Sequence, residues 1–210
     1  MIQSYITVAG RSSEELIINK SRFIGYAAPC ETEDQALSFL REIREAHRSA
    51  THHCYAYIIG ENANVMRYSD NGEPAGTAGM PIMDVMRTRS IVNCCIVVVR
   101  YFGGVLLGTG GLVRAYTQSG QAAVEAAGIS RMELTSVEYC EVPYSAWDRV
   151  RYASEQLPVR IEDISYGSAI SFHLLVRNSD SETVMNHLMD ASGRKLETLH
   201  EKEAFIPWKI

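Results

Sequence analysis

A glycine-dense segment between an apolar run and a helix-like run constrains this chain more than any other feature. Five of the nine residues from Gly103 to Gly111 are glycines, within Arg100-Tyr-Phe-Gly-Gly-Val-Leu-Leu-Gly-Thr-Gly-Gly-Leu-Val-Arg114. Ordering glycine is entropically costly, so a fold keeps such a run where positive φ or close backbone approach is needed. Free N–H groups at a helix start, with arginines on both sides, suit phosphate or carboxylate. The segment therefore predicts contact with an anionic group.

Composition places the chain among ordinary globular proteins. Its 210 residues are 46% hydrophobic and 21% charged, enough for one large domain or two small ones. The formal net charge is −5, with 11 basic and 12 acidic residues before position 130 and 9 and 13 after it. Neither half is a basic module, so any contact with RNA must be a local patch. No apolar run approaches the roughly 18 residues of a membrane span and no signal peptide is evident, which predicts a cytoplasmic protein.

The cysteines predict a reducing compartment. They are five in number, scattered, and mostly embedded in apolar β-like runs. Such residues are expected to be buried free thiols rather than disulfides. The residues are Cys30, Cys54, Cys94, Cys95 and Cys140.

The first 130 residues predict a sheet covered by helices. Residues 4–9, 15–18 and 22–28 read as an antiparallel meander, and 54–59, 64–68 and 91–99 as further strands. Apolar residues at helical spacing predict helices over 32–48, from Pro81, and over 112–127. The turn-rich stretch from Ser69 to Gly79 is long for a structureless connection, and such loops are usually functional.

The pattern restarts near residue 130 and predicts a second domain. Residues 133–142, 159–166, 168–176 and 195–203 are β-like, and 144–156 and 180–191 are helix-like. This βαββαβ order describes a ferredoxin-like domain over 131–210, after an N-terminal domain over 1–130. The expected fold is therefore α+β, with two domains that are both α/β sandwiches.

The nucleotide-binding motifs fail, and no cofactor is expected. A P-loop needs lysine where Thr109 stands, and the dinucleotide fingerprint needs a third glycine where Val113 stands. The alternative is that the glycines only make a tight connection between a strand and a helix.

Polar residues elsewhere invite catalytic hypotheses. His52 and His53 point to opposite faces of a strand, so they cannot both ligate one ion, and His53 cannot easily act as a base for Cys54. Zinc ligation by His52 and Cys54 lacks the remaining ligands, and no metal site is predicted. Asp70 and Glu73 could form an acid/base pair or bind a hard cation, but they could equally cap backbone N–H groups or pair with arginines. His52, His53, Asp70 and Glu73 are thus weak catalytic candidates, and a non-enzymatic role is favoured.

Taken together, the motifs resemble those of the IMPACT/YigZ family. The resemblance rests on Lys20-Ser-Arg-Phe23, His52-His53-Cys54, the stretch from Ser69 to Gly79, and the glycine segment with its flanks from Val98 to Tyr116. It implies an N-terminal fold like domain IV of elongation factor G and the second domain of a ribosomal protein. It also implies a C-terminal domain like domain V of that factor. Eukaryotic members are translational regulators, but their additional N-terminal domain has no counterpart here, so that partnership does not transfer.

These observations favour a translation-related regulator that binds RNA, the ribosome or a translation factor. The alternatives are a protein-docking regulator that binds no nucleic acid and a hydrolase acting on a small anionic or peptide substrate. Arginine and backbone N–H groups would hold phosphates and aromatic rings would stack on bases. We expect Arg100, Glu73 and the glycine segment to share one cleft. The predicted anion- or nucleic-acid-binding residues are Lys20, Arg22, Arg100, Tyr101, Phe102, Gly103, Gly104, Gly108, Thr109, Gly110, Gly111 and Arg114.

Overall fold

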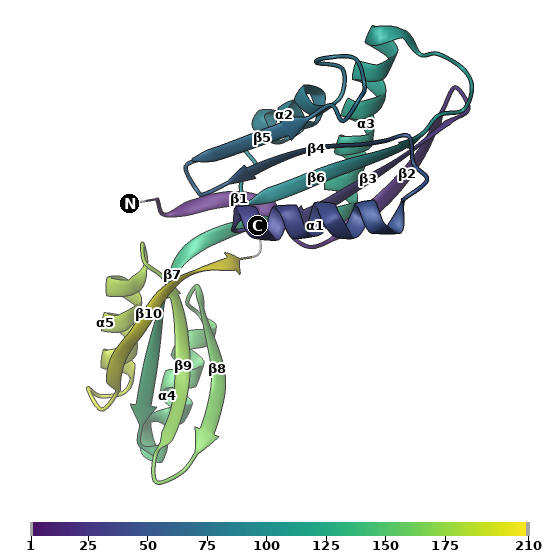
Figure 1. Ribbon diagram of the computed structural model, residues 1–210. Helices are drawn as coiled ribbons and strands as arrows, with labels where there is room; N and C mark the ends of the chain where they lie inside the picture. Colours follow the sequence, from purple (N-terminus) through teal and green to yellow (C-terminus); the bar gives the residue numbers. More distant parts are fainter. Residues whose placement is uncertain (1, 209–210) are drawn as a thin grey trace. The chain divides into compact units, whose positions relative to one another are not determined.

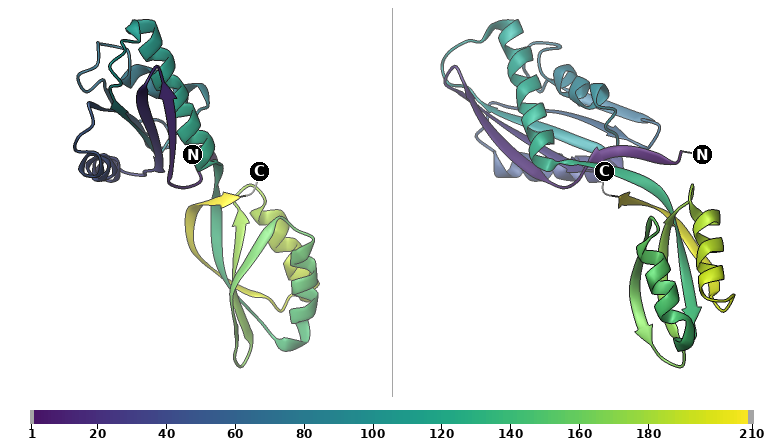
Figure 2. Two further views of the ribbon diagram at one scale, coloured as in Figure 1. Left: turned by 90° about the vertical axis from the view of Figure 1, so that its right-hand side faces the viewer. Right: turned by 180° about the vertical axis from the view of Figure 1, so that it is seen from behind.

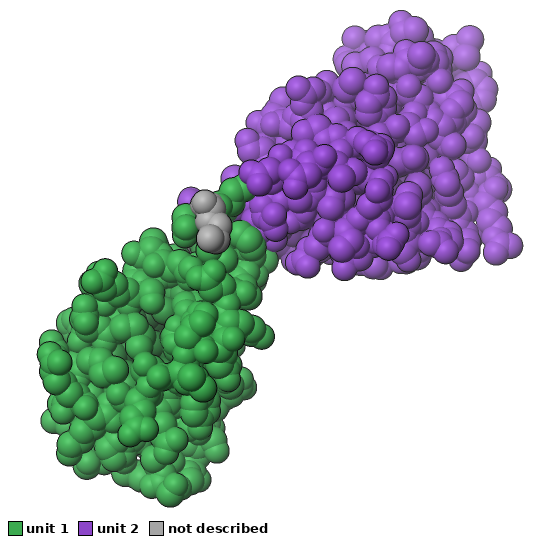
Figure 3. Space-filling view, turned by 60° about the vertical axis from the view of Figure 1, so that its left-hand side comes forward, with its two compact units in different colours: residues 1–4, 132–208 green, residues 5–131, 209–210 purple. Residues whose placement is uncertain are grey.

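The computed structural model describes residues 2–208 and divides the chain into two compact units. The N-terminal unit holds residues 5–131, and the C-terminal unit holds residues 2–4 and 132–208 (Figure 3). Both units combine helices with sheets, so the expected α+β class and two-unit layout are confirmed.

The N-terminal unit is built on a five-stranded antiparallel sheet of order β2-β3-β6-β4-β5. Its central strand β6 is almost entirely buried, which explains its continuous run of apolar, largely β-branched residues. The strands are β2 (Ser12–Ile18), β3 (Ser21–Pro29), β4 (His52–Ile59), β5 (Val65–Ser69) and β6 (Cys94–Tyr101).

Helices cover both faces of this sheet (Figures 1 and 2). The helix α1 (Glu33–Ala46) lies on one face, and its start is capped by the Thr32 hydroxyl, which accepts from the Gln35 N–H at 3.2 Å. The helices α2 (Gly79–Thr88) and α3 (Gly108–Ala127) lie on the other face. Each β6 side chain is therefore assigned to the α1 face or to the α2/α3 face by strand alternation.

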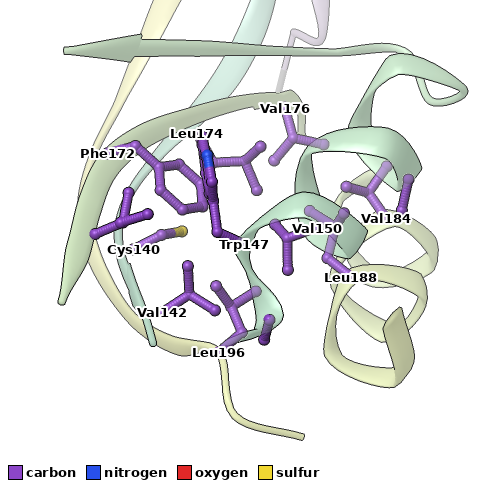
Figure 4. Packing of buried hydrophobic residues seen from close by; sticks show 13 residues of the cluster. Cys140, Val142, Trp147, Val150, Phe172, Leu174, Val176, Val184, Leu188 and Leu196 are labelled. Atoms are coloured by element: carbon purple, nitrogen blue, oxygen red, sulfur yellow. The ribbon is translucent and has the colours of Figure 1, made fainter. Parts of the chain in front are cut away.

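The C-terminal unit contains β7 (Ile129–Val142), α4 (Tyr144–Glu155), β8 (Val159–Tyr166), β9 (Ile170–Arg177), α5 (Ser181–Ala191) and β10 (Glu197–Trp208). The strands run in the order β10-β7-β9-β8, with both helices packed on one face of the sheet. The core between sheet and helices centres on Trp147 and Phe172, whose rings lie 5.3 Å apart (Figure 4). The element order is the split βαβ arrangement that the sequence predicts.

The predicted N-terminal meander is wrong for its first strand. The strand β1 (Ser4–Val8) is hydrogen-bonded to β7 and not to β2. The pairing of β7 with β9 begins only at Thr135, so the first part of β7 has an open edge. β1 pairs along this edge, and just beyond the two strands the Ala9 N–H donates to the Gly128 carbonyl at 3.0 Å.

Two element boundaries near the glycine segment also differ from expectation. The strand β6 extends through Tyr101, so Arg100 lies in the strand rather than after it. The helix α3 begins at Gly108, four residues before the predicted start. The poor helix propensity of glycine explains why the sequence predicts a later start, whereas the structure needs glycine at Gly111 because a Cβ there would lie only 2.9 Å from the Leu107 Cβ.

All five cysteines are free and buried, as the sequence predicts. Within residues 2–208, no helix combines the length and the apolar character needed to cross a membrane.

Candidate functional site

The N-terminal unit contains a cavity of about 430 Å³ at the start of α3. Its walls come from the beginning of β4, the end of β6, the loop between β5 and α2, and the first turn of α3. Leucine, proline and phenylalanine side chains make most of the wall, and a few polar groups meet at one side. Six predicted site residues line it: His52, Glu73, Arg100, Phe102, Gly108 and Thr109.

The guanidinium of Arg100 is buried beside this cavity and already paired. Only 5% of the residue is exposed, and its Nη1 donates to Glu73 Oε1 at 2.6 Å. Its Nη2 donates to the Ser21 hydroxyl at 3.3 Å, while its Nε has no partner. The ring centroids of Phe23 and Phe102 lie 5.3 and 5.4 Å from the guanidinium carbon. A buried carboxylate therefore already neutralises Arg100, and its role as a phosphate ligand stays a prediction.

Glu73 is the centre of a buried polar network. Its Oε1 also accepts a hydrogen bond from the Tyr116 hydroxyl at 2.7 Å, and its Oε2 lies 3.9 Å from His52 Nε2. Burial is the main cause of a strongly raised pKa for Tyr116, so this hydroxyl stays protonated and donates. The expectation that Arg100, Glu73 and the glycine segment share one cleft is confirmed.

His52 is oriented by the loop that follows β5. Its Nδ1 lies 2.8 Å from the Asn71 carbonyl oxygen, which can only accept, so Nδ1 carries the proton. Nε2 is then the nitrogen that faces Glu73. The loop itself is held by Asp70, whose carboxylate accepts from the N–H groups of Gly76, Ala78 and Gly79 at 2.8–3.0 Å. The structure therefore shows Asp70 in the capping role that the sequence left open beside a catalytic one.

The other histidine of the pair lies on the opposite face of β4. His53 Nε2 is 3.0 Å from the His47 carbonyl oxygen, on the side of the sheet covered by α1. Burial lowers the pKa of His53. Cys54 shares the face of His52, and its thiol donates to the Asp70 carbonyl at 2.9 Å. Burial raises the pKa of Cys54 to about 12, which excludes a reactive thiolate at neutral pH.

Several predicted binding residues lie away from the cavity. Tyr101 packs on the α1 face, with its hydroxyl 2.8 Å from His47 Nδ1, so it is not available for stacking on a base in the cavity. Arg22 lies over the Tyr101 ring and is ion-paired with Glu15 at 2.8 Å. The backbone of Lys20 contacts Gly103: a Cβ there would lie 2.0 Å from the Lys20 carbonyl oxygen.

The start of α3 is open toward the cavity. No side chain caps the helix, and Gly108 and Thr109 line the cavity wall. Gly110 and Gly111 follow in the same turn, Gly104 precedes the helix with a φ of +81°, and exposed Arg114 lies one turn further along. Among the described residues, no ion pair is recorded for Arg114.

Sequence reasoning missed Tyr116 and Ser21, the partners of Glu73 and Arg100. Tyr116 lies four residues after Leu112 on the buried side of α3, a spacing that indicated only packing. No group of three histidine, cysteine or acidic side chains within residues 2–208 is arranged to hold a metal ion.

Comparisons with known proteins find relatives that match both halves of the chain. The model of the Impact N-terminal domain matches residues 19–124, and that of a domain of unknown function, DUF1949, matches residues 140–194. The IMPACT family member YvyE of Bacillus subtilis is 33% identical over 93% of this chain and 90% of its own length. An IMPACT family member of Haemophilus influenzae is 34% identical over 85% and 88%.

More distant similarity extends to a eukaryotic protein and to a solved structure. The Protein IMPACT of Rattus norvegicus is 34% identical over 42% of this chain and 29% of its own length. A solved structure described as a hypothetical protein is 28% identical, with a TM-score of 0.62 over 96% of this chain and 99% of that one.

Proposed function

This chain belongs to the IMPACT family, and from that premise we propose that it regulates translation by binding single-stranded RNA, free or on the ribosome, at the cavity beside α3. The regulatory part of the proposal is supported by the resemblance to a family with translational regulators. The RNA part depends on the chemistry of the cavity, which combines an exposed ring with donors for an anion.

The observation that carries the proposal is the pairing of Phe102 with the uncapped start of α3. Phe102 is 46% exposed at the cavity, and a base can stack on such a ring whatever its sequence. The N–H groups of the first helical turn carry partial positive charge, and the glycines there leave room for a phosphate. Arg114, which forms no ion pair with the other residues that the structure describes, adds a cation: a Cβ on Gly110 would lie 3.9 Å from its Nη1, so the guanidinium reaches back over this turn. A nucleotide offers both groups, a flat base and a phosphate.

Arg100 and Arg22 are already ion-paired, which reduces their electrostatic contribution to RNA binding. Within residues 2–208, Lys20 and Arg114 are then the two basic residues of the predicted set that form no ion pair. For single strands, each neutralised phosphate contributes a slope of about −0.7 to the dependence of log K on log salt. Two phosphate contacts therefore predict a slope of about −1.4.

The test is fluorescence anisotropy with a labelled single-stranded RNA of mixed sequence, titrated at several salt concentrations. Phe102→Ala should weaken binding by about 1–3 kcal/mol, a factor of about 5 to 150. Arg114→Ala should reduce the slope by about 0.7. The matched control is Arg41→Ala, an exposed arginine on α1, which covers the other face of the sheet. If the Arg41 and Arg114 variants lose RNA affinity equally, RNA binding is not local to this cavity.

A protein partner is the second candidate, because the segment before α3 exposes apolar side chains. Leu106 is 85% exposed and Val105 is 38% exposed. Side chains of this kind beside a cavity favour contact with another protein, such as a translation factor. Capture of a partner from lysate that resists RNase but is lost with Leu106→Glu would favour this candidate over RNA.

A further inference from the structure

We propose that the cavity also has a catalytic function: His52 acts as a general base, assisted by Glu73, in the hydrolysis of small esters with an apolar acyl group. RNA binding as proposed above uses Phe102, Arg114 and the start of α3, and leaves the His52–Glu73 pair without a role. This pair is the part of the cavity that remains to be explained.

A gain in folding stability does not explain why the polar network around Glu73 is buried. Glu73 and Arg100 are 8% and 5% exposed. The free energy lost when both charges are removed from water equals or exceeds the free energy gained from their attraction. An apolar pair of similar volume would hold the same elements together at least as well. Charged groups kept in a cavity at such a cost are commonly those that perform chemistry.

The geometry fixes the role of each atom of His52. The Asn71 carbonyl holds the proton on Nδ1, so Nε2 carries the lone pair when the ring is neutral. Glu73 Oε2, 3.9 Å from Nε2, stabilises the imidazolium that forms when Nε2 accepts a proton. Glu73 is itself held in place by Arg100 and Tyr116 at its other oxygen.

The remaining ionisable neighbours do not compete for the proton. Burial raises the pKa of Tyr116, which donates to Glu73 from α3, and of Cys54, which donates to the Asp70 carbonyl from β4. Arg100, from β6, is paired with Glu73. His52 Nε2 is therefore the nitrogen of this cluster that is placed to accept a proton from water.

The reaction needs only water as a co-reactant. His52 Nε2 takes a proton from water while the water oxygen bonds to the ester carbonyl carbon, and the carbonyl electron pair moves onto its oxygen. The donors for that oxyanion are the N–H groups of Gly108 and Thr109, which belong to the uncapped start of α3 in the cavity wall. When the carbonyl re-forms, the bond to the leaving alcohol breaks and the proton on Nε2 passes to the alkoxide. The products are one carboxylic acid and one alcohol.

The walls set the substrate class. Pro74, Phe102, Leu107 and Leu112 give the cavity an apolar lining, and its volume of about 430 Å³ is within the range for small ligands. A short aliphatic or aromatic acyl group fits these walls, with its carbonyl carbon toward His52. A highly charged acyl group would not be solvated there.

The experiment measures release of p-nitrophenol from p-nitrophenyl butyrate and p-nitrophenyl benzoate by the full chain. His52→Asn retains an N–H for the Asn71 carbonyl but removes the base, and His52→Gln is a second variant. We expect either variant to lose at least 100-fold in kcat/KM. His53→Gln is the matched control on the opposite face of β4 and should keep the activity of the unaltered protein.

A pH profile separates the base from a structural role. The pH profile of the rate should differ between the unaltered protein and His52→Asn, because only the unaltered protein carries the proposed base. Circular dichroism checks that each variant is folded, and Tyr116→Phe gives a milder perturbation of Glu73 that keeps the Arg100 contact. Release no faster than in buffer, or equal rates in His52→Asn and the unaltered protein, would overturn the proposal.

Discussion

Replacing Glu73 by glutamine should destabilise the N-terminal unit strongly, because it leaves the Arg100 cation buried without its counter-charge. Glutamine keeps the size of the side chain, so the variant removes the charge with little loss of packing. Arg100 is 5% exposed, and the rings of Phe23 and Phe102 lie over its guanidinium, so water replaces the carboxylate poorly. Removing one member of a buried ion pair costs about 3–5 kcal/mol. With an m-value of about 2 kcal/mol per molar urea, the unfolding midpoint should fall by about 2 M.

The assay has an internal control in the chain. Both tryptophans, Trp147 and Trp208, belong to the C-terminal unit, so their fluorescence follows the unfolding of that unit. Far-UV circular dichroism reports both units. Glu73→Gln should therefore move one component of the dichroism transition to lower urea and leave the fluorescence midpoint unchanged.

The double variant tests the physical cause. Arg100→Met together with Glu73→Gln removes the uncompensated charge and fills much of the same space, so it should recover most of the lost stability. A single Glu73→Gln variant with a midpoint within about 0.5 M of the unaltered protein, converted with the same m-value, would refute the reasoning. A double variant no more stable than Glu73→Gln would refute it as well.

Three further predictions concern the surroundings of the cavity. Gly103→Ala should disrupt the N-terminal unit, because its Cβ would lie 2.0 Å from the Lys20 carbonyl oxygen. Gly104→Ala meets open space and should lower the free energy of unfolding by only about 1 kcal/mol, because of its φ of +81°. Equal urea midpoints for the two variants would contradict this. Asp70→Asn should cost about 1.5–3 kcal/mol by weakening the bonds to three N–H groups, and an unchanged midpoint would rule out the capping role. The pKa of Cys54 is about 12 in the folded protein and about 9 in the unfolded chain, so the unfolded thiol loses its proton first as the pH rises. The free energy of unfolding should therefore fall above about pH 9. This fall should be smaller in Cys54→Ala. A thiol reagent that labels folded protein quickly at pH 8 would argue against that burial.

The sequence predicts most of this fold because its signals are local. Thr32 marks the start of α1, and the continuous apolar run in β6 marks a strand buried on both faces. The position of β1 could not be predicted, since it depends on an open edge of β7 more than a hundred residues away. The start of α3 was misplaced because glycine has a poor helix propensity, so the glycines of the first turn do not indicate a helix.

The candidate site was predictable in its location but not in its charges. The glycines and the turn-rich loop indicated which segments converge, and Glu73, Arg100 and Gly108 do line one cavity. Sequence position alone does not reveal whether an arginine faces solvent or a buried acid. Strand alternation places Arg100 on the α3 face, where Glu73 meets it, and places Tyr101 on the α1 face.

The two functions proposed for the cavity make separable demands on the same few residues. RNA binding depends on the exposed ring of Phe102 and on Arg114, neither of which has a role in proton transfer. Ester hydrolysis depends on His52 Nε2, which lies beside the buried Glu73 and not on the exposed rim. If both functions operate, a base stacked on Phe102 must occupy the space that an acyl group needs, because both lie in a cavity of about 430 Å³. Single-stranded RNA should then inhibit ester hydrolysis competitively, raising KM and leaving kcat unchanged, and Phe102→Ala should relieve that inhibition. Inhibition that lowers kcat with KM unchanged would place the RNA elsewhere on the molecule.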